Sequence, residues 1–476
     1  MSKEKPAKTK EVKIPGRGRT QAVINTANII DNSDGQLFPS LYAQIGTDVG
    51  LNPLQLGTIT GIRSFLQAAT TPMWGWWNDK HSRKRVLAFG CFFWSIFTIL
   101  TAISVTYVDM LIWRSITGIG LAVIIPTTSS LIADYIAPEK RGKAYGWLGL
   151  TGVLGAVVGT VYATAIGDSV IMGITGWRFV FLTWGALSII IGVTILAVAK
   201  DPLRGEMEPE LMKVLTAQKA EKYKVKRSDF KKILSNKTFD IILLQGVAGS
   251  LPWNGIFFMI TWFEYIGFDS LTAGLIFALV AIGAAVGNLF GGWIGDRAAK
   301  WRPRSGRIIA AQISVFSGIP LTYVIFLLIP AVTDSILLFV IFGALTGLLI
   351  SWCGPQNSTI FSDIFEPEIR GTVFSVDRVF EGSVAALGTV FVGAASLLFG
   401  FIQPPLGMTV PEFRAANPAA AVANTAALGQ AMFLVAVIPW ILCLIFYTLA
   451  YKTYAVDAEK MRKKLEQRGR ELEKMK

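Results

Sequence analysis

Long apolar stretches separated by short polar segments dominate the chain. We count twelve stretches of roughly 20 residues, the length that a helix needs to cross a hydrocarbon core of about 30 Å. They run near residues 21–45, 54–77, 86–106, 109–133, 143–166, 177–198, 239–263, 271–294, 307–330, 334–357, 372–401 and 427–451. This pattern predicts an all-α membrane protein with twelve transmembrane helices.

The composition supports that class. Hydrophobic residues make up 52% of the 476 residues and charged residues only 16%, whereas soluble domains carry about a quarter. So few polar side chains cannot cover an apolar core in water, which excludes a soluble fold. Cys91, Cys353 and Cys443 all fall inside apolar stretches and are expected to be buried thiols. We therefore expect no disulfide, metal site or cofactor.

Lysine and arginine gather in alternate loops. The basic set comprises 80–85, 140–143, 200–237, 297–307, Arg370 and the tail from Lys452, whereas 47–53, 106–109, 264–270 and 331–334 carry no base. Because basic loops stay on the cytoplasmic side, both termini are predicted to be cytoplasmic, with the chain in the cell (inner) membrane. This asymmetry also explains the formal net charge of +13 without a nucleic-acid partner.

The same pattern divides the chain into domains. We expect a cytoplasmic basic tail (1–20), an N-terminal six-helix bundle (21–199), a cytoplasmic central loop (200–238), a C-terminal six-helix bundle (239–451) and a cytoplasmic charged tail (452–476). Residues 207–223 of the central loop form either an interfacial helix or part of a plain tether. The charged tail is either a solvated helix or disordered.

An internal repeat relates the two halves. Nine residues recur 229 positions later, from Thr117, Gly118, Pro126, Ser129, Asp134, Pro138, Glu139, Arg141 and Gly142 to Thr346, Gly347, Pro355, Ser358, Asp363, Pro367, Glu368, Arg370 and Gly371. Nine matches at one shift are unexpected by chance. They predict two pseudo-symmetric bundles, a known transporter architecture.

The polar loops carry a recognisable motif. Gly75-x-x-x-Asp79-Lys80-x-Ser82-Arg83-Lys84 resembles the loop signature of the major facilitator superfamily, with Ser82 in place of a glycine, and Gly292-x-x-x-Asp296-Arg297 is similar to its second copy. The segment from Arg114 to Gly120 resembles the fourth-helix motif of this family. Within it, the chain is most similar to the spinster-type and organic-anion branches. The residues that carry this narrower resemblance are Ile132–Tyr135, Pro138–Gly142, Gly176–Arg178 and Asp201–Gly205.

The resemblance implies a gate at the cytoplasmic side. Asp79 would face the start of helix eleven near 371–373, and Asp296 the start of helix five near 142–144, where exposed N–H groups attract a carboxylate. These contacts would favour the outward-facing state. The alternative is a basic loop that only sets the topology. The candidate gate residues are Gly75, Asp79, Lys80, Arg83, Lys84, Asp134, Arg141, Gly292, Asp296, Arg297, Asp363, Arg370, Asp377 and Arg378.

A second set of candidates lies at membrane depth, where an ionisable group is costly and defaults to a functional or paired role. The candidates for substrate and proton binding are Asp31, Asp34, Arg63, Arg114, Asn254 and Glu381. Asp31 and Asp34 share a helix face, and one or the other is expected to pair with Arg63, unless Arg63 extends to an interface. Arg114 is either an anion anchor or the partner of a helix-one acid. The Gly- and Pro-rich segment 249–255 is either a break near the binding site or a packing seam.

These features predict a secondary transporter that works by rocker-switch alternating access. We expect proton coupling through a carboxylate, because the single histidine, His81, lies in a loop. The expected substrate is a small organic anion or an anionic amphiphile such as a lysolipid. Broad drug efflux, uniport and a non-transporting membrane sensor are the alternatives. An enzyme is not expected, since the chain has no phosphate-binding loop motif. We expect membrane lipids as surroundings and a monomer.

Overall fold

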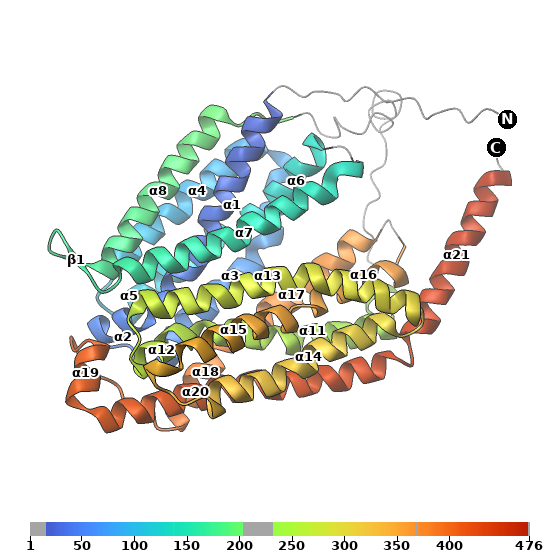
Figure 1. Ribbon diagram of the computed structural model, residues 1–476. Coiled ribbons are helices and arrows are strands. Elements are labelled where there is room, and N and C mark those ends of the chain that lie inside the picture. The colour runs from blue at the N-terminus through green and yellow to red at the C-terminus, as the bar shows by residue number, and fades with distance from the viewer. Residues whose placement is uncertain (1–15, 137, 203–231, 367–368, 475–476) are drawn as a thin grey trace.

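Two helical bundles, one from each half of the chain, make up the computed structural model (Figure 1). It describes residues 16–136, 138–202, 232–366 and 369–474, without the side chains at 79, 133, 138–142, 371, 468–469 and 471–474. The segment 207–223 therefore lies outside the described residues. Each bundle contributes six membrane-length helices, so the predicted fold class is confirmed.

The N-terminal bundle holds the first six spans, with the fourth divided between α5 and α6. Its elements are α1 (Arg17–Ser40), α2 (Tyr42–Val49), α3 (Pro53–Lys80), α4 (Arg83–Ala102), α5 (Tyr107–Leu121), α6 (Ile124–Tyr135), α7 (Pro138–Ile166), the hairpin β1 (Val170–Ile171) and β2 (Ile174–Thr175), and α8 (Gly176–Val198). Helices α1 and α7 pack closely: a Cβ at Gly155 would lie 2.4 Å from the Ile29 carbonyl oxygen. Glycine is therefore required there.

The C-terminal bundle repeats this arrangement of six spans. It also has two helices outside the spans, α19 and α21. Its elements are α11 (Lys237–Gly255), η1 (Ile256–Phe258), α12 (Met259–Ile266), α13 (Ser270–Trp301), α14 (Gly306–Tyr323), η2 (Val324–Leu328), η3 (Thr333–Ser335), α15 (Ile336–Ile350), α16 (Cys353–Ile364), α17 (Arg370–Ala385), α18 (Leu387–Leu398), α19 (Val410–Ala416), α20 (Pro418–Ala450) and α21 (Tyr454–Lys474). The charged tail thus forms a helix, α21, which projects from this bundle (Figure 1).

Ten of the spans within the described residues are apolar enough to be identified as membrane-crossing by composition alone. The other two are α1 and α3, in which polar side chains lower the hydropathy. Both carry residues of the predicted central site, Asp31 and Asp34 on α1 and Arg63 on α3. The two least apolar spans thus hold three of the buried charges.

The first and seventh spans are both interrupted. Helix α1 contains Pro39 and ends at Ser40, before α2 continues the span. Helix α11 contains Pro252 and ends at Gly255, where the 3₁₀ turn η1 begins. Segment 249–255 itself stays helical, and the 3₁₀ turn follows it at Ile256–Phe258. The two interruptions meet across the bundle interface, with the rings of Tyr42 and Phe258 4.7 Å apart.

The bundles touch through paired glycines near one end, which we name the closed end. A Cβ at Gly57 would lie 2.3 Å from the Thr389 carbonyl oxygen, and one at Gly274 would lie 2.4 Å from the Thr164 hydroxyl oxygen. Gly57 and Gly274 are 217 residues apart and Thr164 and Thr389 are 225 apart, so the two contacts are related by the repeat. Loops add to this contact, since Gly407 N–H donates to the Thr47 carbonyl at 2.9 Å.

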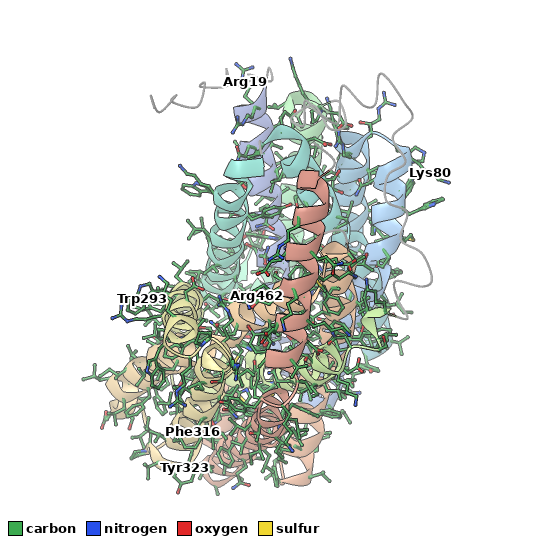
Figure 2. All side chains as sticks on the ribbon, turned by 90° about the vertical axis from the view of Figure 1, so that its right-hand side faces the viewer. Arg19, Lys80, Trp293, Phe316, Tyr323 and Arg462 are labelled. Carbon is green, nitrogen blue, oxygen red and sulfur yellow. The ribbon has the colours of Figure 1, made fainter. Side chains whose placement is uncertain are left out.

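The bundles diverge toward the opposite end, which we name the basic end because it carries 80–85, 297–307 and α21 (Figure 1). Figure 2 looks onto this end and shows Arg19 and Lys80 on the N-terminal bundle. Two ion pairs described at this end each lie within one bundle: Arg83 pairs with Asp134, and Arg307 with Asp296. The two bundles thus lie farther apart at the basic end than at the closed end (Figure 1).

Gly57→Ala is expected to separate the two bundles at the closed end, where Gly57 packs against Thr389. The added methyl group would overlap the Thr389 backbone, which cannot move as a flexible side chain would. Spin labels on cysteines at Val105 and Val422, one exposed residue from each bundle, would report a longer distance by pulsed electron resonance. Gly149→Ala is the matched control, because a Cβ there meets nothing within 4 Å. An unchanged distance in Gly57→Ala would contradict this role for the glycine contact.

Candidate substrate and proton site

Asp34 is the centre of a charge cluster inside the N-terminal bundle. Its side chain is fully buried, and its Oδ1 accepts from the Arg114 guanidinium at 3.1 Å. The Thr98 hydroxyl donates to Oδ2 at 3.0 Å. Arg63 lies farther away, with its NH2 nitrogen 3.9 Å from Oδ1. Asp34 therefore has close partners from α4 and α5 and a weaker one from α3.

Arg114 is enclosed on every side. Its side chain has 0% exposure, and its guanidinium carbon lies 5.5 Å and 5.4 Å from the ring centres of Phe38 and Phe181. The sequence leaves two alternatives for this residue, an anion anchor and an ion pair with a helix-one acid. The structure places it in the ion pair with Asp34, where cation–π contacts add to its stabilisation.

Arg63 is buried but incompletely paired. Its side chain is 9% exposed, and its contact with Asp34 is longer than a hydrogen bond. Its Nε has no partner among the described residues. A Cβ on Gly35 would lie 3.8 Å from its NH2 nitrogen, so the absence of a side chain there leaves room beside the guanidinium. Since a guanidinium carries five N–H donors, Arg63 has donors without a close acceptor among the described residues.

Asp31 lies one turn before Asp34 on α1 and is also buried, with 8% exposure. Its Oδ1 has no hydrogen-bond partner in the described part of the chain. With both aspartates ionised, the cluster of Asp31, Asp34, Arg63 and Arg114 carries no net charge. Protonation of Asp31 would therefore leave it with one positive charge. Protonation of Asp34 would have the same effect on the charge, but Asp34 has an ion pair with Arg114 and a hydrogen bond from Thr98, which Asp31 lacks in the described structure.

The C-terminal bundle holds a second polar site, a cavity of about 380 Å³. Its polar lining includes Gln245, Ser250, Asn288, Asn357, Asp377 and Glu381. The predicted gate residue Asp377 and the predicted cavity residue Glu381 are thus brought together. Arg378 is 76% exposed and lies 3.9 Å from Glu381. Asn254 is half-buried next to the break at Gly255 and is not one of the cavity residues.

The predicted gate residues of the N-terminal bundle are mainly bonded within it. Arg83 is buried at 2% exposure, its Nε donates to Asp201 at 2.8 Å, and a terminal nitrogen pairs with Asp134. Lys80 lies over the Trp76 ring at 3.9 Å. Arg83 therefore fastens α4 to α6 and to the chain after α8. The side chains of Asp79 and Arg141 lie outside the described residues.

The predicted gate residues of the C-terminal bundle are likewise bonded within their own bundle. Asp296 accepts from Arg307 at 3.0 Å, and Asp363 accepts from the Tyr454 hydroxyl at 2.7 Å. Arg370 donates to the Ser362 carbonyl at 2.6 Å, and Arg297 lies over Trp293. The resemblance implies that Asp296 meets the start of α7 only when the basic end is closed. In the present arrangement, Asp296 pairs with Arg307 instead.

The two motif glycines occupy equivalent places. A Cβ at Gly75 would lie 3.9 Å from Pro126, and one at Gly292 would lie 4.0 Å from Pro355. These are ordinary contact distances, so neither position needs a glycine in this conformation. The equivalence shows the two-fold repeat in three dimensions. Any requirement for glycine belongs to another conformation.

Arg83→Gln is expected to lower the free energy of unfolding by about 1–3 kcal/mol, because Asp134 and Asp201 would lose a charged donor. Lys84→Gln, at the next position, is the matched control and should change little. Thermal unfolding of the two purified variants gives the comparison. Equal melting temperatures for both would show that Arg83 does not fasten the bundle.

Sequence reasoning overlooked a group at the closed end. Gln44, Asp168, Glu264 and Ser270 come together there from four segments of the chain. The available signal was Glu264, a single acid within the apolar stretch of α12. Because the other members lie in or near short loops, nothing in the sequence indicated that they meet.

Comparison with known proteins decides the family. A profile of the Major Facilitator Superfamily matches residues 26–389, which is most of the chain. The chain belongs to the Major Facilitator Superfamily. Membership makes it a membrane transporter rather than an enzyme, and confirms the multi-pass architecture read from the sequence.

Within this superfamily, the fold is similar to a bacterial homologue of the human lysosomal transporter Spinster, solved inward-facing and unoccupied. The TM-score is 0.81 at 21% identity, over 94% of this chain and 99% of that one. Curated relatives include a sodium-dependent phosphate transport protein of Arabidopsis thaliana chloroplasts (25% identity, 57% of this chain, 53% of the relative) and a D-galactonate transporter of Escherichia coli (24%, 59% and 68%). The alignment spans about half the length of the chloroplast relative. The resemblance to the spinster-type and organic-anion branches is confirmed.

Proposed function

We propose that this superfamily member is a proton-coupled transporter of a small organic anion. The observation that carries the proposal is the partly paired Arg63 beside the unpartnered Asp31, in a cluster of two cations and two acids. An anion could bind to Arg63 when Asp31 is protonated, because the cluster then has a net positive charge. Anion and proton would therefore bind together, as in symport.

The relatives support the substrate class. A D-galactonate transporter and a phosphate transport protein, by their names, both carry anions. A guanidinium with free N–H groups suits carboxylate and phosphate oxygens, which accept pairs of hydrogen bonds from it. The carboxylate or phosphate headgroup of an anionic amphiphile could bind to Arg63 in the same way. The uptake experiment below therefore includes a lysolipid.

Alternating access would expose this cluster to each side in turn. We propose that the basic end is cytoplasmic, as the distribution of lysine and arginine favours, so that the present arrangement is inward-facing. The paired glycine contacts at the closed end would then separate in the outward-facing state. The carboxylates of Asp79 and Asp296 would engage the opposite bundle at the basic end in that state.

The proposal is tested by uptake into liposomes that contain the purified protein. Sugar acids, small carboxylates, inorganic phosphate, a lysolipid and a cationic drug would be offered with and without an inward proton gradient. We expect one of the anions to accumulate only when the gradient is present. Uptake of the cationic drug alone, or anion uptake indifferent to the gradient, would contradict the proposal.

A further inference from the structure

A buried acid holds the two bundles together at the closed end. Glu264, on α12, is 5% exposed, although it lies between segments of both bundles. The N-terminal bundle supplies Gln44 and Asp168, and the C-terminal bundle supplies Glu264 and Ser270. The Gln44 amide nitrogen lies 2.8 Å from Asp168 Oδ1 and 2.9 Å from Glu264 Oε1. The contacts of Glu264 with Gln44 form only while the two bundles are together.

The contacts of the Ser270 hydroxyl, which also accepts from the Gln44 amide at 2.9 Å, point to an extra proton in this cluster. Its Oγ lies 2.5 Å from Asp168 Oδ2 and 2.5 Å from Glu264 Oε1. Each distance is that of a short hydrogen bond between a hydroxyl and a carboxylate. A serine hydroxyl has one proton and can donate to only one of the two. The second short contact therefore requires a proton on one of the carboxyl groups.

Burial assigns that proton to Glu264. Its second oxygen, Oε2, is buried and has no partner among the described residues, which an ionised carboxylate would need. Asp168, in contrast, is exposed at the edge of a cavity of about 550 Å³, where water can reach its carboxyl group. A carboxylic acid at Glu264 can donate to Ser270, whose own proton then goes to Asp168.

The neighbouring charges are engaged elsewhere. Asp48 pairs with Arg178 at 3.3 Å, and the Arg414 guanidinium donates to the Ile266 carbonyl at 2.9 Å. Asp269 accepts from the Thr272 N–H at the start of α13, and hydrogen bonds from Thr272 hold its pKa below the ordinary value. None of these groups forms an ion pair with Glu264 in the described structure.

We propose that Glu264 is a proton-binding site that locks the closed end of the transporter. Separation of the bundles would remove Gln44 and Asp168 from Glu264 and expose its carboxyl group to water, where it ionises. Closing this end therefore takes up one proton from the side that the end faces. By linkage, one proton changes the ratio of closed to open molecules by up to about tenfold per pH unit. This device does not depend on the substrate or on Asp31.

The test measures the distance between the bundles at the closed end as a function of pH. Spin labels on cysteines at Val105 and Val422, in a full-length chain with Cys91, Cys353 and Cys443 replaced by alanine, report this distance by pulsed electron resonance. We expect the short-distance population to increase as pH falls from about 9 to 5, since the closed state binds the additional proton. Glu264→Gln should remain closed at every pH, because its amide keeps a donor for Ser270 without titrating.

Asp269→Asn is the matched control, since asparagine keeps the cap of α13 and removes a carboxylate at the same cavity. It should retain the full pH dependence. The proposal is overturned if Glu264→Gln titrates like the unsubstituted chain, or if Asp269→Asn loses the response.

Asp168→Asn keeps the proposal testable if Glu264→Gln fails to fold. The introduced amide can donate to the Ser270 hydroxyl, whose own proton is then free to go to Glu264. An ionised Glu264 would therefore fit the closed end better than before, and the pH midpoint of closing should change. An unaltered midpoint in Asp168→Asn would overturn the proposal.

Discussion

Arg114→Ala should lower the free energy of unfolding by about 3–5 kcal/mol, the effect of leaving a buried charge without its partner. Asp34 would keep its burial and the Thr98 hydroxyl but lose the guanidinium at 3.1 Å. Arg63, at 3.9 Å, is too distant to replace it without movement. Thermal unfolding in detergent measures the effect.

A double-mutant cycle separates the ion pair from simple loss of packing. Asp34→Asn combined with Arg114→Ala should be more stable than Arg114→Ala alone, because no uncompensated charge remains. Arg462→Ala is the control for loss of an exposed pair, since Arg462 and Glu466 on α21 are 69% and 56% exposed. It should change stability by no more than about 1 kcal/mol. A double variant as unstable as the single one would contradict a role for the charge.

Arg63→Gln should weaken binding of the transported anion by about tenfold to a hundredfold, the loss expected for charge-assisted hydrogen bonds. Its effect on folding should be smaller than that of Arg114→Ala, because its ion contact is long. Binding would be measured by calorimetry with the anion that the uptake experiment identifies. Arg63→Lys should restore only part of the affinity, since lysine lacks the planar pair of donors.

Arg378→Gln is the control for this measurement. Its side chain is 76% exposed on α17, so removal of its charge should leave affinity within a few-fold of the original. If Arg63→Gln and Arg378→Gln weaken anion binding equally, Arg63 would act only through the long-range electrostatic attraction between the positively charged protein and the anion. A direct contact with the anion would then be excluded.

The sequence predicts helices better than the partners of their charged residues. Most predicted spans agree with the structure within a few residues, because hydropathy and charged loops mark their ends. The twelfth helix begins at Pro418 rather than near 427, since its first turns are rich in alanine, which is only weakly apolar. Helix α13 extends to Trp301 rather than ending near 294, because its last turns leave the apolar region and continue as a polar helix.

The site could be predicted as a set of residues but not as a set of pairs. Asp31 and Asp34 share a helix face, and three residues of spacing cannot determine which one meets Arg114. That choice depends on how α1 is rotated against α4 and α5. The proposed proton site at Glu264 could not be predicted from the sequence for a similar reason. Asp168 approaches Glu264 and Ser270 only through contact between the bundles.

Calorimetric measurement of protons taken up when the anion binds tests the central claim most directly. In the account, protonation of Asp31 gives the cluster its net positive charge. Asp31 lies near Asp34 on its own helix, Arg63 on α3 and the Cys91 thiol on α4. Binding is compared in buffers of different ionisation enthalpy, in the unsubstituted chain and in Asp31→Asn. The account predicts uptake of about one proton and stronger binding as pH falls in the unsubstituted chain, with neither in Asp31→Asn. Equal proton uptake in both chains would contradict it.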